Sequence, residues 1–153
     1  MSLGSGPAYG FQYHTEEQIM NSESIVRTTL KLSVPLNFIG AYLFAFPSSD
    51  FGKLIEMPQN APLLHSLLLS FLIFLFGIIY GWLARHADVF QPLLFVGGFA
   101  KICFFIIGAS LWLCGDASGG LTSILVVDLT FGAIWLWAYR QYSFSPGACA
   151  NTT

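Results

Sequence analysis

Two charged residues stand inside long apolar runs of this chain and are its strongest chemical signal. Lys101 lies near the centre of the run 90–113, and Asp128 lies inside the next run, 121–139. A charge near the middle of a bilayer costs about 2.5 to 3.5 kcal/mol on insertion scales, so each residue needs a partner. A short Gly-rich turn joins the two runs, which places the charges at similar depth on antiparallel neighbours. The sequence therefore predicts a buried Lys101/Asp128 ion pair.

This pair has two competing interpretations. In the structural one, it fixes which helix faces which, and Gly97, Gly98 and Gly132 let the two backbones approach closely. In the functional one, it borders a polar cavity and titrates or opens when a proton or substrate enters. We favour the structural interpretation, because one charge pair without further acids makes a poor proton relay. Four residues are candidates for an extended polar lining if they face inward: Asn37, Tyr80, Ser110 and Thr130.

No other constellation points to catalysis. His65 and His86 lie near opposite ends of one apolar run, about 30 Å apart by helical rise, so they cannot bind one haem within a chain. The spacing of His86 and Asp88 is too sparse for a metal site. The cysteines show no disulfide or zinc spacing; they are Cys103, Cys114 and Cys149. We identify no catalytic residue and expect no cofactor and no metal, which disfavours an enzyme.

The composition places the chain in a membrane. Of its 153 residues, 55% are hydrophobic and only 9% are charged, too few to cover a soluble globule. The net charge is −2, and the basic residues form no cluster. A nucleic-acid footprint and a polybasic lipid patch are therefore excluded, and the bilayer is the expected partner.

The apolar runs predict the fold. Four runs are long enough to cross a bilayer as helices: residues 28–46, 63–84, 90–113 and 121–139. Their short connections predict an all-α, four-helix transmembrane bundle over residues 28–140, with antiparallel up-down-up-down order. Residues 1–27 are expected to form a soluble N-terminal tail, and residues 141–153 a flexible C-terminal tail.

Proline and glycine refine the first two predicted helices. Pro35 removes one backbone hydrogen bond inside the first, and Pro47 ends it. Gly77 and Gly81 have the Gly-x-x-x-Gly spacing that lets another helix approach closely. We favour packing within one chain for these glycines over a dedicated dimer contact.

Basic residues near the ends of the runs predict the orientation. One side collects four of them, Arg27, Lys31, Arg85 and Arg140, and the other holds only Lys53. The first side is therefore expected to be cytoplasmic, together with both termini. Aromatic residues agree as interfacial anchors: Trp82, Trp135, Trp137 and Tyr139 toward the inner interface, and Trp112 toward the outer one.

Several short patterns carry a resemblance to a family. They are Asn37 in the first run, FAFPSSDFGKL after it, FGIIYGWLA in the second, Gly-x-x-Lys ending at Lys101, and Asp128-Leu129 in the fourth. Over about residues 27–140 the chain resembles small bacterial four-helix membrane proteins that are distantly similar to DoxX-like proteins. The resemblance implies a compact four-helix bundle in the bacterial inner membrane, and it implies no particular activity.

Two functions follow as hypotheses. The first is a helper or assembly component of a membrane complex, which would associate with another membrane protein or with further copies of itself. The alternative is a small carrier or channel-like protein for a proton-coupled or lipophilic molecule, with Lys101 and Asp128 lining its path. An enzyme acting on a lipid or quinone would need more convergent polar groups than the sequence offers.

Overall fold

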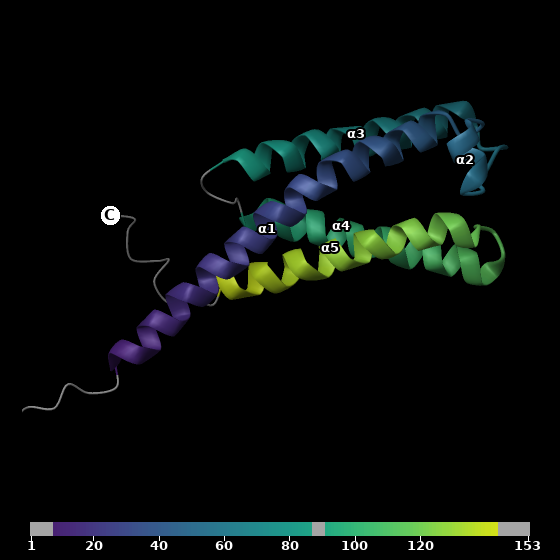
Figure 1. Ribbon diagram of the computed structural model, residues 1–153. Helices are drawn as coiled ribbons and strands as arrows, with labels where there is room; N and C mark the ends of the chain where they lie inside the picture. Colours follow the sequence, from purple (N-terminus) through teal and green to yellow (C-terminus); the bar gives the residue numbers. More distant parts are fainter. Residues whose placement is uncertain (1–7, 87–90, 144–153) are drawn as a thin grey trace, which may run out of the picture.

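The chain folds into helices arranged as two antiparallel hairpins (Figure 1). A computed structural model describes residues 8–86 and 91–143, and no strand occurs within these ranges. The helices are α1 (Ala8–Ala45), α2 (Asp50–Leu54), α3 (Leu63–Arg85), α4 (Gln91–Cys114) and α5 (Gly119–Ser143). Helix α1 pairs with α3, and α4 pairs with α5.

Three of the described helical segments are long and apolar enough to cross a membrane. They are Leu63–Arg85, Pro92–Cys114 and Gly119–Gln141. These segments agree closely with the predicted runs 63–84, 90–113 and 121–139, so the all-α and membrane-like character is confirmed. The fourth predicted run, 28–46 in α1, is not among them. Lys31 and Asn37 interrupt that run with polar groups, which lowers its hydropathy.

Helix α1 differs most from the prediction. It begins at Ala8, so residues 8–27, expected as a tail, are helical and continuous with the predicted first span. This segment contains no proline, and its three Glu, two Gln and one Met favour helix. An ion pair one turn apart, between Arg27 and Glu23 at 2.7 Å, adds to its stability. The helix ends at Ala45, just before Pro47, as predicted.

Glycines and a serine bring α3 close to α1. A Cβ added to Gly77 would lie 2.9 Å from the ring of Phe38, and one added to Gly81 would lie 3.4 Å from Val34. Nearer the other end of α1 and α3, Ser70 Oγ donates a hydrogen bond to Ala41 O at 2.6 Å. The Gly77/Gly81 face therefore contacts α1 within the chain.

The second hairpin has an equally close contact. A Cβ on Gly132 of α5 would lie 2.8 Å from Gly98 O of α4, and one on Gly98 would lie 3.1 Å from Gly132 O. Such distances leave no room for a side chain on either residue, so the two backbones cross here in direct contact.

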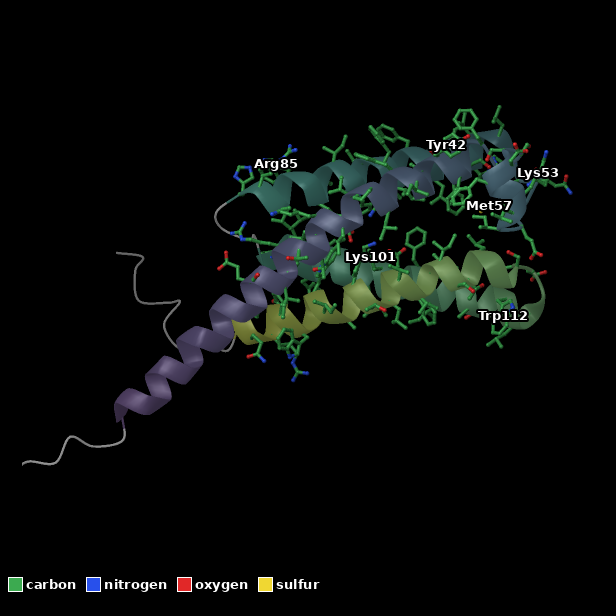
Figure 2. The ribbon with its side chains drawn as sticks, in the orientation of Figure 1. Tyr42, Lys53, Met57, Arg85, Lys101 and Trp112 are labelled. Carbon is green, nitrogen blue, oxygen red and sulfur yellow. The ribbon has the colours of Figure 1, made fainter. Side chains whose placement is uncertain are left out.

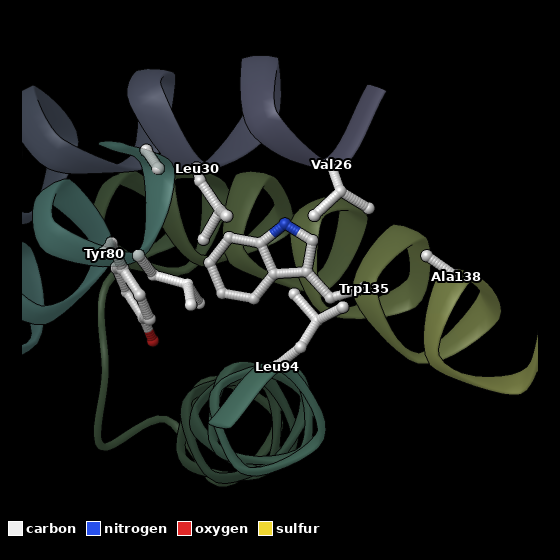
Figure 3. Close-up of a cluster of buried hydrophobic side chains, with 8 residues drawn as sticks. Val26, Leu30, Tyr80, Leu94, Trp135 and Ala138 are labelled. Carbon is white, nitrogen blue, oxygen red and sulfur yellow. The ribbon is translucent and has the colours of Figure 1, made fainter. Parts of the chain in front are cut away.

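The hairpins meet where α1 crosses α5. Val26 and Leu30 of α1 pack with Trp135 and Ala138 of α5 in the main buried cluster, which Leu94 of α4 also joins (Figure 3). Trp135 Nε1 donates a hydrogen bond to Thr29 Oγ1 at 2.9 Å.

A smaller contact joins the far ends of the hairpins. Ser118, in the turn between α4 and α5, donates its hydroxyl to Ile55 O at 3.2 Å. Helix α2, which precedes Ile55, is capped by Ser49, whose Oγ accepts from Gly52 N at 3.1 Å. The connection between α1 and α3, residues 46–62, thus contains one short helix and touches the second hairpin.

Candidate functional site

The predicted pair of Lys101 and Asp128 is present as a buried ion pair. Lys101 of α4 is only 6% exposed, and its Nζ donates to Asp128 Oδ1 of α5. The Asp128 side chain remains 31% exposed. Figure 2 shows Lys101 midway along the molecule, between the two hairpins. An ammonium with a direct carboxylate partner satisfies the requirement for an intramembrane charge.

Two aromatic rings complete the surroundings of Lys101. Its Nζ lies 5.5 Å from the ring centre of Tyr80 and 5.7 Å from that of Trp135. Both distances suit a cation–π attraction. The two rings also contact each other edge to face, with centres 4.8 Å apart. Because Tyr80 belongs to α3, the Lys101 ammonium touches the first hairpin as well as the second.

Trp135 is the site residue that sequence reasoning misplaced. It was expected at the inner interface, but it is fully buried at the crossing of α1 and α5. Trp135 follows Asp128 by seven residues, which places both on one face of α5. That spacing is the signal that could have assigned it to the site.

The glycines near the pair lie where a packing role requires them. A Cβ on Gly97 would lie 3.1 Å from the Tyr80 ring and 3.3 Å from the Trp135 ring. Gly98 and Gly132 form the backbone crossing of α4 and α5, and a Cβ on Gly132 would lie 3.3 Å from Lys101 Cβ. These glycines leave room for the aromatic rings and bring the lysine and aspartate helices together.

Of the four candidate lining residues, only Tyr80 joins the pair. Ser110 and Thr130 are exposed and donate their hydroxyls to their own helices, at Ile106 O and Val126 O. Asn37 likewise donates to Ser33 O on α1, at 2.7 Å. These side chains are therefore satisfied locally and do not extend a polar path from Lys101.

The histidines and cysteines whose side chains are described stay apart from this site. His65 and His86 are exposed near the two ends of α3, Cys103 is half-buried and Cys114 is exposed. Cys149 and Asp88 lie outside the described residues. Within the described ranges, no three His, Cys, Asp or Glu side chains gather closely enough to hold a metal ion.

The arrangement suits a fixed ion pair better than a relay. Lys101 has one carboxylate and two ring faces around it, and these come from α3 and α5. Since Lys101 itself belongs to α4, its ammonium is held by side chains and backbone of three helices, α3, α4 and α5. No family model, curated protein or solved structure matches this chain.

Proposed function

We propose that this chain is a small polytopic scaffold that serves as a helper or assembly component of a membrane complex. The observation that carries the proposal is the position of Lys101, which extends from α4 to Asp128 and Trp135 of α5 and to Tyr80 of α3. In this role the ion pair holds α4 against α5, and the contact of Lys101 with Tyr80 ties that hairpin to the first one.

The surface of the helices supports the same role. Large apolar side chains are exposed on α1, α3, α4 and α5, as lipid or partner helices would require. The polar hydroxyls on outward faces, such as those of Ser110 and Thr130, are bonded to their own helices. A partner helix or a second copy can therefore pack on these faces without stranding a polar group.

A fourth span and its orientation belong to this proposal. The α1 segment from Val34 to Ala41 packs along α3 from Gly81 to Ser70, which is itself long and apolar enough to cross a membrane. Residues 28–46 would then share that depth, giving four spans in up-down-up-down order. The excess of basic residues at one end favours cytoplasmic termini, and the DoxX-like resemblance favours a bacterial inner membrane.

The alternative is a carrier or channel-like role for a proton-coupled or lipophilic molecule. The observation that favours it is the partial exposure of Asp128, whose carboxylate a proton could reach. In that role, protonation of Asp128 would release Lys101 and loosen α4 from α5.

A charge-removal series separates the two roles. Lys101→Met and Asp128→Leu each strand one buried charge, so each should cost about 3 to 5 kcal/mol of stability. The double variant removes both charges and should recover most of that loss. Unfolding in mixed detergent micelles measures the stability. Lys53→Met and Asp116→Leu are matched controls, because both residues are exposed near helix ends.

The cellular phenotype of the double variant decides between the functions. If stability and phenotype both return, the pair is structural and the scaffold proposal stands. If stability returns while the phenotype stays lost, the pair takes part in transport. The carrier or channel-like role then replaces the scaffold proposal. A particle that is strictly monomeric and without a partner in mild detergent would also contradict the scaffold.

A further inference from the structure

A pocket of about 530 Å³ lies between the end of α1 and the start of α3, far from Lys101. Five of its lining residues carry hydrogen-bonding side chains: Tyr42, Ser48, Ser49, Gln59 and Ser66. No Asp, Glu, Lys or Arg is among the lining residues. Tyr42 lies at the α2 end of the first hairpin, where the chain turns from α1 to α3 (Figure 2). The size suits a small-molecule group, and the lining is apolar over most of its area with uncharged polar groups among it.

The start of α3, which lines this pocket through Leu63 and Ser66, carries backbone donors without acceptors. Its N-cap is Pro62, which provides no side-chain acceptor. The first α3 amide with an acceptor is Ser66 N, which bonds to Pro62 O at 3.1 Å, so within the described chain those of Leu63, Leu64 and His65 have none. Open N–H groups and the positive end of a helix dipole attract an anion.

Ser66 provides an independent indication of a ligand. This residue is only 8% exposed, it lines the pocket, and its hydroxyl has no hydrogen-bond partner among the described residues. The Ser66 oxygen is not enclosed, since among the described residues only Ser33 has a fully buried side-chain oxygen without a partner, so the Ser66 hydroxyl is open to the pocket and can donate to a ligand. The hydroxyl and the α3 amides come from the same turn of helix, so one acceptor group can be reached by both.

The loop beside the pocket is held in place by Gln59. Its Nε2 donates to Pro47 O at 2.9 Å and to Met57 O at 2.8 Å, which ties the end of α1 to the segment before α3. With both contacts made by the Gln59 amide nitrogen, the pocket wall is fixed before a ligand arrives. Such preorganisation lowers the entropic cost of binding.

The position of the pocket indicates where the anion comes from. The apolar segment of α3 begins at Leu63, so the pocket lies at the end of a candidate membrane span. Beyond the pocket, along the first turns of α3, large apolar side chains are exposed, including Leu64, Leu67 and Phe71. A molecule with an anionic head and acyl chains fits this sequence of surfaces.

We propose that this pocket binds the phosphate group of a membrane phospholipid. The Ser66 hydroxyl and the open α3 amides donate to the phosphate oxygens, and the acyl chains lie along the exposed apolar face of α3. This site is separate from the Lys101/Asp128 pair and does not depend on the role of that pair.

Three probes test the proposal on the purified full chain in a neutral detergent. They are short-chain phosphatidylglycerol, diacylglycerol with the same chains, and inorganic phosphate. Native mass spectrometry measures binding, and thermal stabilisation measures it independently. Phosphatidylglycerol should bind, whereas diacylglycerol, which lacks the phosphate, should bind at least tenfold more weakly.

Two variants and one control localise the binding. Ser66→Ala should weaken phosphatidylglycerol about tenfold without loss of folding, because the hydroxyl makes no bond within the described protein. Ala61→Trp places a bulky ring in the pocket wall at an exposed position and should abolish binding. Ser110→Ala, which also removes one membrane-helix hydroxyl, should bind as the natural protein does.

Each contrary result overturns a defined part of the proposal. Equal binding of diacylglycerol, or equal behaviour of Ser66→Ala and Ser110→Ala, would overturn phosphate recognition. If inorganic phosphate binds as tightly as phosphatidylglycerol and displaces it, the anion comes from water and the lipid source is overturned.

Discussion

Trp135 links the ion pair to the crossing of the two hairpins. One part of its indole lies beside the Lys101 ammonium, and its N–H donates to Thr29 Oγ1 of α1 at 2.9 Å. Thr29 is held in turn by its own helix, since its hydroxyl contacts Ile25 O and Val26 O. A single residue of α5 therefore connects a charge on α4 with the backbone of α1.

Trp135→Phe should destabilise the protein by about 1 to 2 kcal/mol. The variant keeps a ring near Lys101 but loses the hydrogen bond to Thr29 and leaves a space in the buried cluster. Trp137→Phe is the matched control, because Trp137 is 47% exposed and should change stability by less than about 0.5 kcal/mol. Reversible unfolding in mixed micelles measures both. Equal losses for the two variants would show that Trp135 is not the connecting residue.

At the scale of single residues, the Lys101/Asp128 pair could be predicted from the sequence more fully than the residues that surround it. Lys101 and Asp128 could be paired because an intramembrane charge demands a partner and both lie at similar depth. Tyr80 could be named only as a candidate, and Trp135 was assigned to an interface. Aromatic contacts depend on the rotation of each helix about its axis, which three-dimensional packing fixes and residue spacing only restricts.

At the scale of helices, small residues set the distances. Gly132 and Gly98 bring α4 and α5 into backbone contact, and Gly77 lets α1 approach α3. Gly40 of α1 is different, because an added Cβ would lie 3.5 Å from Ile73, an ordinary contact distance. Glycine is thus required at some helix contacts and replaceable at others.

Gly132→Ala and Gly40→Ala should therefore have opposite effects. At Gly132 the added methyl would lie 2.8 Å from Gly98 O and 2.9 Å from Ile102 Cγ1, so α4 and α5 must separate at a cost of about 1 to 3 kcal/mol. At Gly40 the methyl fits and alanine favours helix, so stability should hold or rise by up to about 1 kcal/mol.

Thermal unfolding in detergent compares the stability of these two variants directly. The rate at which a cysteine introduced into α4 forms a disulfide with one introduced into α5 reports the separation of the two helices. A Gly132→Ala protein as stable as Gly40→Ala would mean that the backbone crossing is not required.

The helices themselves could be predicted where the apolar pattern was strong. The runs that became α3, α4 and α5 were located to within a few residues, because their length and hydropathy dominate local signals. The predicted start of the first helix, residue 28, differs from the observed start at Ala8, since residues 8–27 carry no apolar run and their polar composition is also typical of a tail. A continuous helix adds each new turn without a new nucleation step, which favours extension of α1 beyond its buried part.

At the scale of the whole molecule, two hairpins share few contacts and depend on them. They meet at the α1/α5 crossing, at the Lys101 site, and at the Ser118 hydrogen bond to Ile55 O. Each hairpin is closely packed within itself through the α1/α3 and α4/α5 contacts. The relative orientation of the hairpins is therefore expected to be less rigid than either hairpin, and the α1/α5 crossing and the contact of Lys101 with Tyr80 restrain it.

The pairing of α1 with α3 also determines the topology to be expected. Val34 of α1 lies against Gly81 of α3, and Ala41 lies against Ser70, so the two helices run antiparallel over the same depth. At one end, Arg27 donates to His86 O, directly after α3. If α3 crosses the membrane, we expect α1 to cross it beside α3, with Ser24 and Ser48 on opposite sides.

Single-cysteine labelling tests this topology in a protein whose natural cysteines are replaced by alanine. In spheroplasts, a membrane-impermeant maleimide should label Ser48→Cys and Lys53→Cys, which are exposed near α2. Ser24→Cys and Arg85→Cys should react only after the membrane is opened, because basic residues favour the cytoplasmic side. Labelling of Ser24→Cys together with Ser48→Cys from outside would mean that α1 does not cross. The polar groups of α1, including Lys31 and Asn37, would then lie at the surface, and the apolar face of α3 would need another partner.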